Sequence, residues 1–264
     1  MSKAQIHASA LVSNKAELGA DVEIGPFSIV EAGAVIGDGT KLHGHSYICG
    51  PTVLGKNCEV YPYAVLGQPP QDTKYKGEDT KLIIGDETII REHVTMHPGT
   101  KEGRGETRVG RGGVFMVASH IAHDCRVGDY VVFANHAALA GHVSIGDGCI
   151  LGGLSAVHQF CRVGNYAFVG SMAMVTKDVI PYGSVLGNHA HLAGLNIVGL
   201  KRQNVSKATI HELRSAYKAL FVDDDVFENR LKHVANSFSS SPEVMQIVDF
   251  IRDINVRSLC MPNG

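Results

Sequence analysis

The sequence has no tryptophan, and aromatic residues make up only 6% of its 264 positions. A core without many large rings has to be built from small and aliphatic side chains. No apolar run approaches the ~20 residues that crossing a bilayer requires, so we expect no transmembrane segment. The net charge of −2 excludes a global field that would draw the chain to nucleic acid. The first residues, MSKAQIHASALV, lack the layout of a signal peptide, and we expect a cytoplasmic protein.

The cysteine spacing predicts neither a set of disulfides nor a zinc site. Six cysteines are present, but no two of them form a CxxC pair, and a reducing cytoplasm disfavours disulfides. The repeat described next assigns four of them to small interior positions, namely Cys58, Cys125, Cys149 and Cys161. We therefore expect these cysteines to be buried core fillers.

What the sequence does contain is a six-residue repeat that runs from Ile6 to about residue 180. The first place of each hexad holds a large apolar residue, as in Ile24, Val30, Ile36, Leu42, Ile48, Leu54, Phe115, Ile121, Val127, Phe133, Leu139 and Ile145. The fifth place holds a small or short residue, as in Ser28, Ala34, Thr40, Ser46, Ser119, Cys125, Val131 and Ala137. Self-similarity at a fixed period is the sequence signature of a solenoid.

This pattern resembles that of the hexapeptide-repeat acyltransferases. The resemblance implies a mainly β fold, a left-handed parallel β-helix in which three hexads form one triangular coil of 18 residues. The left-handed sense comes from the resemblance alone. Coils of a β-helix stack at the strand spacing, about 4.8 Å, so residues 18 apart in sequence lie above one another.

Two segments depart from the repeat. Residues 67–83 keep the phase but lose the apolar pattern, and residues 97–108 are a polar insertion. We expect both to be loops thrown out from the coil. Loops on a rigid scaffold are where functional residues concentrate.

Beyond the repeat the apolar spacing changes to that of a helix. Helices are predicted over residues 206–221 and 226–234, and Ser241-Pro242-Glu243 is typical of the start of a third. We therefore expect a β-helix over residues 1–185 and a small helical domain over residues 186–264.

Histidines gather along one edge of the expected coil. Counting in coils places the following residues in one vertical ladder, roughly 15 Å tall at about 4.8 Å per step: His97, His123, Gly141, His142, His158 and Gln159. Histidine is suited to act as a base near neutral pH. Asp124 or its backbone could orient the His123 ring, and the glycine one coil above could offer a backbone N–H to an oxyanion.

Two other interpretations of the ladder remain open. Its members could be solvated turn histidines without a chemical role. They could also supply a set of zinc ligands, as in the γ-class carbonic anhydrases, which share this repeat. Hydration of carbon dioxide, however, would need neither the two loops nor the helical tail.

Longer motifs carry a more specific resemblance. In chain order they are QDTKYKGE, IREHVTMHPGT, MVASHIAHDCRVGD, LAGHVSIGD, GGLSAVHQFCRVG, GNHA and LNIVGLKR. Over essentially the whole chain they resemble the UDP-N-acetylglucosamine O-acyltransferases of lipid A biosynthesis. The resemblance implies a homotrimer that transfers a (3R)-hydroxyacyl chain from acyl carrier protein to the 3-position of UDP-N-acetylglucosamine, or of its 3-amino analogue. This reaction is the first step of lipid A biosynthesis.

The resemblance also implies roles for the residues that match these motifs. His123 would be the general base, with Asp124 beside it, and Gly141 would supply the oxyanion N–H. No metal or cofactor is implied. The residues implied to bind the amino sugar, its phosphates and the nucleotide are Gln71, Asp72, Lys74, His97, His120, His142, His158, Gln159, Asn196 and Arg202.

The acyl chain would lie in a groove between subunits that includes Gly153, is capped by Ser171 and ends near His189. Because serine is small, we expect a chain of about 12 to 14 carbons. Val198 and Gln203 stand where many relatives carry a glutamate and an arginine, so nucleotide contacts are expected to differ here. The acidic carrier protein is expected to meet a basic patch that consists of Lys201, Arg202, Lys207, Arg214 and Lys218.

Overall fold

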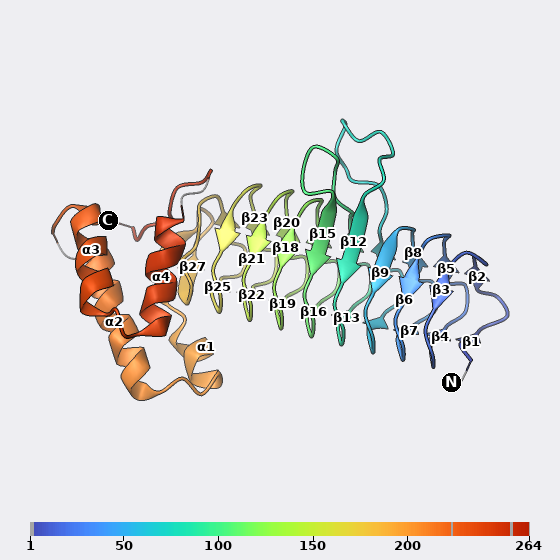
Figure 1. Cartoon of the computed structure of the whole chain (residues 1–264), viewed down its shortest axis with the longest axis horizontal. Coiled ribbons are helices and arrows are strands. Elements are labelled where there is room, and N and C mark those ends of the chain that lie inside the picture. The colour runs from blue at the N-terminus through green and yellow to red at the C-terminus, as the bar shows by residue number, and fades with distance from the viewer. Residues whose placement is uncertain (1–2, 223, 254–255, 264) are drawn as a thin grey trace.

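The computed structural model describes residues 3–222, 224–253 and 256–263. They form a long three-sided coil of short parallel strands with helices at one end (Figure 1). The predicted left-handed parallel β-helix followed by helices is therefore confirmed. None of the described helices has the length and apolar character needed to cross a membrane.

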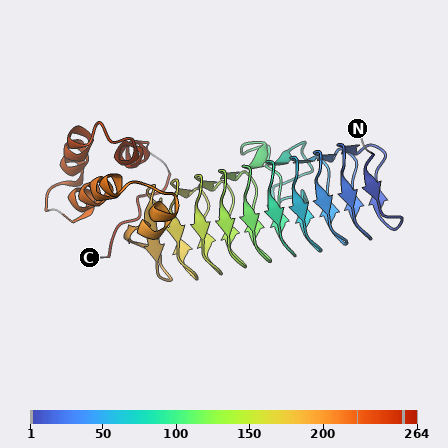
Figure 2. The same cartoon turned by 90° about the horizontal axis from the view of Figure 1, so that it is seen from below.

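Each side of the coil is one sheet, and Figure 2 shows a row of its stacked strands. Sheet A contains β1 (Gln5–Ile6), β4 (Glu23–Ile24), β7 (Lys41–Leu42), β10 (Glu59–Val60), β13 (Ile89–Ile90), β16 (Val114–Phe115), β19 (Val132–Phe133), β22 (Ile150–Leu151), β25 (Phe168–Val169), β27 (Gly183–Leu186) and β28 (His191–Leu195). Sheet B contains β2 (Leu11–Val12), β5 (Ile29–Val30), β8 (Tyr47–Ile48), β11 (Val65–Leu66), β14 (Thr95–Met96), β17 (His120–Ile121), β20 (Ala138–Leu139), β23 (Ala156–Val157) and β26 (Met174–Val175). Sheet C contains β3 (Glu17–Leu18), β6 (Val35–Ile36), β9 (Thr52–Leu54), β12 (Lys81–Ile84), β15 (Glu106–Val109), β18 (Arg126–Val127), β21 (Ser144–Ile145) and β24 (Arg162–Val163).

The hexad explains both the core and the register. Ile121 pairs with Leu139, which pairs with Val157, so the 18-residue arithmetic holds. The first-place side chains fill the interior and are almost fully buried from Ile24 onward, whereas Ile6 is 46% exposed because no coil lies beneath it. The fifth-place residues are buried with them. All six cysteines are free and buried, which confirms the four predicted core fillers and adds Cys49 and Cys260.

The turns have a feature that the sequence reading missed. The fourth place of the hexad adopts a left-handed backbone conformation, and ordinary residues such as Asp124 (φ 60°) and His142 (φ 63°) occupy it. The glycine that often follows the large apolar residue has a different reason. A Cβ on Gly37 would stand 2.5 Å from the backbone of Gly55 in the next coil, so close stacking excludes a side chain there.

Both loops are shorter than expected. Strand β12 already begins at Lys81 and β15 at Glu106, because Leu82 and Thr107 are buried and pair with each other in sheet C. The remaining loop residues, 67–80 and 97–105, leave the coil at the same corner and project together from its upper edge in Figure 1.

The expected boundary at residue 185 falls inside β27. Sheet A continues through β28, which pairs antiparallel with β27. The helices then follow as α1 (Ile197–Arg202), α2 (Lys207–Phe221), α3 (Phe227–Ser237) and α4 (Pro242–Arg252). Helix α1 was not predicted. Ser241 does precede α4, but its hydroxyl donates to Glu212 on α2 instead of capping the helix.

Candidate active site

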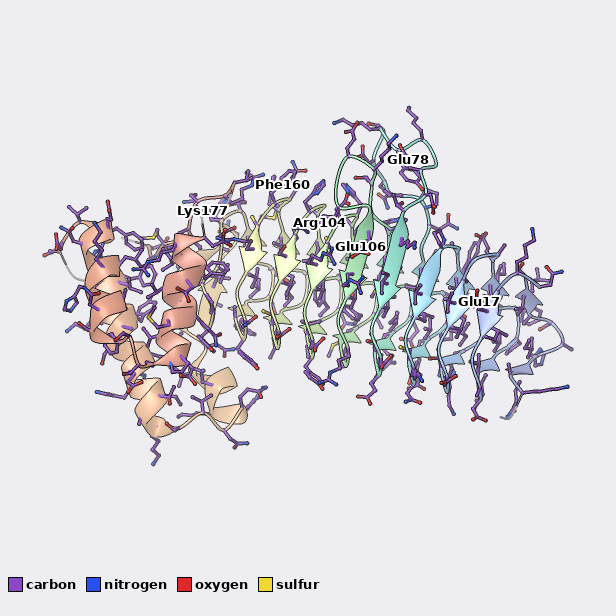
Figure 3. The ribbon with its side chains drawn as sticks, viewed as in Figure 1. Glu17, Glu78, Arg104, Glu106, Phe160 and Lys177 are labelled. Carbon is purple, nitrogen blue, oxygen red and sulfur yellow. The ribbon has the colours of Figure 1, made fainter. Side chains whose placement is uncertain are left out.

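One corner of the coil, where sheet B turns into sheet C, carries the candidate site. Both loops leave the coil there, and the turns after β14, β17, β20 and β23 bring the predicted ladder together. Thr95 pairs with His120, which places His97 level with Ala122, as the sequence arithmetic predicted. Phe160 and Lys177 continue the same edge toward the helices (Figure 3).

At the centre of this corner His123 and Asp124 form a pair. The left-handed turn at Asp124 folds its carboxylate back onto the preceding ring, and the distance between His123 Nδ1 and Asp124 Oδ2 is 2.8 Å. An ionised carboxylate can only accept, so the His123 Nδ1–H donates and Nε2 keeps its lone pair. The Asp124 side chain is fully buried, while that of His123 is 18% exposed.

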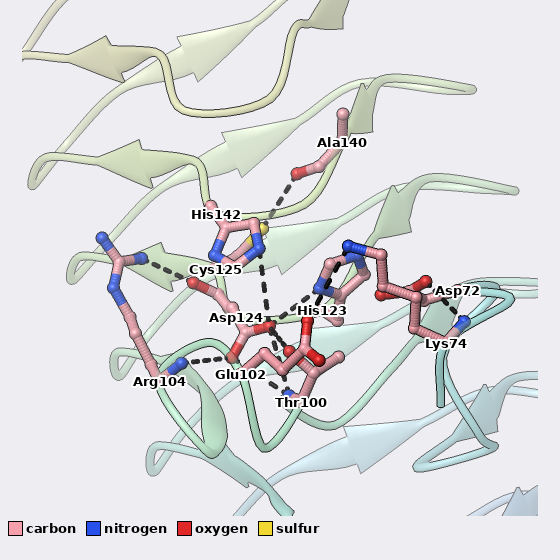
Figure 4. Close-up of polar contacts among 10 residues, drawn as sticks. All are labelled: Asp72, Lys74, Thr100, Glu102, Arg104, His123, Asp124, Cys125, Ala140 and His142. Atoms are coloured by element: carbon pink, nitrogen blue, oxygen red, sulfur yellow. Dashed lines mark hydrogen bonds and ion pairs between the residues drawn. The ribbon is translucent and has the colours of Figure 1, made fainter. Parts of the chain in front are cut away.

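The second loop holds the Asp124 carboxylate in place (Figure 4). It accepts hydrogen bonds from the Thr100 hydroxyl (2.6 Å), the Thr100 N–H (3.1 Å) and the Arg104 N–H (2.6 Å). Burial by itself would raise the pKa of Asp124, but the hydrogen bonds from His123, Thr100 and Arg104 outweigh it and hold this pKa well below its usual range. A Cβ on Gly103 would overlap the carboxylate. Thr100, Gly103 and Arg104 were not predicted from the sequence.

Gly141 lies one coil above and packs against the His123 ring. A Cβ on this residue would stand 2.6 Å from His123 Nε2. The Gly141 N–H donates to no group among the described residues, although its carbonyl accepts from Phe160. Gly141 thus has an unpaired N–H, among the described residues, in the turn that packs against the His123 ring.

His142 also contacts the His123–Asp124 pair. Its ring centroid is 5.0 Å from that of His123, and its Nε2 is 3.8 Å from Asp124 Oδ2. Phe160 stacks on it at 4.6 Å. Burial lowers the pKa of His142 more than Asp124 raises it, which favours a neutral ring at neutral pH.

His97 and His120 lie one coil below, with ring centroids 5.2 Å apart. His97 Nδ1 bonds the Gln68 carbonyl at 2.8 Å, and its Nε2 is buried without a partner among the described residues. His120 Nδ1 is hydrogen-bonded to Thr95 at 2.7 Å. Burial, together with the neighbouring His97, lowers the pKa of His120 to about 4. Both rings are therefore held in place by a hydrogen bond at Nδ1.

The first loop approaches the pair from the side. Lys74 Nζ lies 3.7 Å from Glu102 Oε2 of the second loop, a contact drawn in Figure 4. The Lys74 N–H donates to Asp72 Oδ1, and Asp72 is near enough to His142 to raise its pKa slightly against the effect of burial. Gln71 is exposed in the same loop.

Other predicted residues lie away from the ladder within one chain. Asn196 caps α1 by accepting from the Gly199 N–H, and with Arg202 it lines a cavity of about 460 Å³ against sheet A. Gly153 and Ser171 lie at the corner between sheets A and B, and His189 is exposed beyond it. Within one chain, these residues therefore lie apart from the histidine ladder.

A metal does not fit this corner. His123, Asp124 and His142 offer ligand atoms within 4.8 Å of one another, the one such group among the described residues. However, the Asp124 carboxylate already accepts four hydrogen bonds, and a cation would have to displace them. Three histidines do not form such a group among the described residues, and His97 contacts Gln68 and His120 instead.

A hexapeptide coil that carries an oriented histidine–carboxylate pair and a free backbone N–H has the form of a hexapeptide-repeat acyltransferase. Residues 33–68 match the model of bacterial transferase hexapeptide repeats, and residues 178–260 match domain 2 of UDP-N-acetylglucosamine O-acyltransferases. The acyl-[acyl-carrier-protein]–UDP-N-acetylglucosamine O-acyltransferase of Caulobacter vibrioides is 54% identical, over 97% of this chain and 98% of that protein. The chain belongs to this family of O-acyltransferases.

Solved structures agree with this assignment. The LpxA structure from Acinetobacter baumannii is 41% identical, with a TM-score of 0.93 over 97% of this chain and 99% of that one. The UDP-N-acetylglucosamine O-acyltransferase from Moraxella catarrhalis is 40% identical, with a TM-score of 0.94 over 97% and 99%. Both similarities extend through the coil and the helical tail.

Proposed function

We propose that this chain transfers a (3R)-hydroxyacyl group from acyl carrier protein to the 3-position of UDP-N-acetylglucosamine, or of its 3-amino analogue, as the first step of lipid A biosynthesis. The observation that carries the proposal is the placement of His123 Nε2 against Gly141, with the ring held by a buried Asp124. The names of the full-length relatives supply the substrates.

The geometry supports a general-base mechanism. His123 Nε2 takes the proton from the sugar 3-hydroxyl, or 3-amino group, as that group attacks the thioester carbonyl carbon. The carbonyl oxygen becomes negative and accepts a hydrogen bond from the Gly141 N–H. The intermediate then collapses, the carbon–sulfur bond breaks, and His123 gives the proton to the departing thiolate, which leaves as a thiol. Asp124 remains ionised and stabilises the imidazolium between the two transfers.

The surrounding side chains are proposed to hold the acceptor. Asp72, Lys74, His97, His120 and His142 would bind the amino sugar and its phosphates, because the first loop and the turns that follow β14, β17 and β20 lie at the same corner as the base. Gln71 is exposed in the same loop. Three further residues are proposed to complete the nucleotide site, namely Gln159, Asn196 and Arg202.

A homotrimer is proposed because the histidine ladder and the residues of the acyl groove lie on different corners of one chain. Around Gly153 and Ser171, the side chains of Leu154 and Met172 are 61% and 69% exposed, which is the apolar character expected of a surface that another subunit covers. In that arrangement Gly153, Ser171 and His189 of a neighbouring copy would border the acyl groove beside the ladder.

The nucleotide contacts and the location in the cell are also proposed. Val198 is exposed at the start of α1 and lines the cavity of Asn196, so an apolar side chain faces the position expected for the nucleotide.

The basic patch, Lys201, Arg202, Lys207, Arg214 and Lys218, is proposed to dock the acidic carrier. Six free, buried thiols fit the reducing cytoplasm.

Transfer of a hydroxyacyl group to UDP-N-acetylglucosamine by the purified chain tests the proposal. His123→Ala should lower kcat by about 10²–10⁴-fold while the oligomer persists, since a general base contributes about that much. His233→Ala, at an exposed histidine on α3, is the matched control and should keep the wild-type rate. A His123→Ala variant with the wild-type rate would refute the mechanism, and stoichiometric zinc with carbon dioxide hydration would favour the carbonic anhydrase alternative.

A further inference from the structure

The C-terminal segment after α4 is attached to the coil beside the top of the ladder. The Asp178 N–H donates to the Ser258 carbonyl (2.9 Å), and the Cys260 N–H donates to the Asp178 carbonyl (2.7 Å). The Leu192 N–H also donates to Met261 at 3.0 Å. These bonds fix the backbone that carries Arg257.

Arg257 reaches from this segment to the turn that holds the last rung of the ladder. Its Nε donates to the Gln159 carbonyl at 3.0 Å, and its Nη2 lies 2.9 Å from His158 Nδ1. A guanidinium has donors and no acceptor. His158 Nδ1 also lies 3.3 Å from the Gln159 carbonyl, to which it would have to donate. The contact with Arg257 is shorter, at 2.9 Å, and the Gln159 carbonyl already accepts from Arg257 Nε, so we assign Nδ1 as the acceptor of the guanidinium and place the proton of a neutral His158 ring on Nε2.

This assignment reverses the hydrogen-bond polarity of the ladder at its top. His97 Nδ1 donates to the Gln68 carbonyl and His123 Nδ1 donates to Asp124, so Nε2 of each neutral ring is an acceptor. His158 instead presents a donating Nε2–H. Lys177 follows one coil above Gln159, and its side chain adds positive charge at this end (Figure 3).

We propose that Arg257 is a positioning residue that fixes His158 as the Nε2–H tautomer, so that the top rung binds a phosphate oxygen of a substrate. This inference rests on the proposed function, in which both substrates carry phosphate. The oxygen belongs either to the diphosphate of the nucleotide sugar or to the phosphate of the carrier's phosphopantetheine arm. A donor beside two cationic side chains suits either source.

Steady-state kinetics of Arg257→Ala in the full-length chain tests the inference. KM for one of the two substrates should rise about tenfold, the effect of losing about one charge-assisted hydrogen bond, while kcat changes by less than about twofold. A rise for UDP-N-acetylglucosamine identifies the diphosphate, and a rise for the acyl carrier identifies the arm. Arg252→Ala, at an exposed arginine that ends α4, is the matched control and should leave both KM values unchanged.

A spectroscopic readout separates positioning from a merely structural role. In histidine-labelled protein, the ¹⁵N shifts should show His158 protonated on Nε2 in the wild type and a tautomer mixture in Arg257→Ala. Arg257→Lys, which keeps a cationic donor, should retain most of the Nε2–H form and gives the same measurement if the alanine variant fails to fold.

A double mutant checks that Arg257 acts through His158. Adding Arg257→Ala to His158→Ala should leave KM where His158→Ala alone puts it. Additive effects, or an unchanged tautomer and unchanged KM values in the single variants, would overturn the inference. A wild-type protein that transfers no acyl group would instead refute the proposed function, and the tautomer measurement would still decide the role of Arg257.

Discussion

Gly141 lies so close to the ring of His123 that a Cβ added to the glycine would stand 2.6 Å from Nε2. The nitrogen proposed to take the proton and the N–H proposed to stabilise the oxyanion are thus set by the stacking of two coils. The spacing is fixed by backbone hydrogen bonds, among them one from His142 N–H to the His123 carbonyl at 3.0 Å. Changes at this contact should affect the chemistry more than the fold.

Gly141→Ala should therefore lower kcat by about 10²–10³-fold, the usual effect of losing an oxyanion donor, because the new methyl group displaces His123 or the N–H. Thermal unfolding should stay close to that of the wild type, since Gly141 does not adopt a left-handed conformation. Kinetics and calorimetry on the same preparation check both statements. A variant that turns over normally would show that this contact has no catalytic role.

Thr100→Val should reduce kcat about tenfold and lower the free energy of unfolding by about 1–3 kcal/mol, because Asp124 loses its 2.6 Å hydrogen bond from the hydroxyl. Thr107→Val is the matched control. The Thr107 hydroxyl is buried without a partner among the described residues, so its removal should be neutral or slightly stabilising. Equal losses in the two variants, measured by denaturant unfolding, would contradict the role given to Thr100.

Acidification should destabilise the folded chain through His120. Its pKa falls to about 4 on folding, mainly through burial, whereas an unfolded histidine titrates near 6.5. Between about pH 6.5 and 4 the unfolded state binds more protons, so stability is lost as the pH falls through this window. His120→Gln should flatten the dependence by roughly 1–3 kcal/mol, allowing for solvent access. Parallel pH profiles of unfolding for the two proteins would contradict this assignment.

Ser171→Met should shift the preferred hydroxyacyl chain from about 12–14 carbons to a shorter one, because the larger side chain would fill the end of the proposed groove. Rates with acyl carriers of graded length measure the shift. Because Ser171 is exposed, the variant should unfold like the wild type, so the shift in chain length can be measured without a change in stability. A wild-type preference for ten carbons, or an unchanged preference in the variant, would contradict the groove.

Much of the fold was contained in the sequence. A large apolar residue such as Leu139 and a short one such as Ala137 recur at fixed places, because each coil must fill the same narrow interior. That periodicity specified the sheets and the register, and it gathered the histidines on one edge. It did not reveal that β12 and β15 begin inside the irregular segments, since their pairing depends on burial of Leu82 and Thr107.

The electrostatics of the site were decided only by the tertiary structure. The bonds from Thr100 and Arg104 to Asp124 join residues 24 and 20 positions apart through a loop that breaks the repeat, so no period could place them. Arg257 likewise meets His158 only because the C-terminal segment returns to the coil. A short repeat specifies which residues stack, since stacking follows from the backbone. The partners of a buried carboxylate or a histidine ring depend on how distant, aperiodic segments fold back, and only three-dimensional packing determines that.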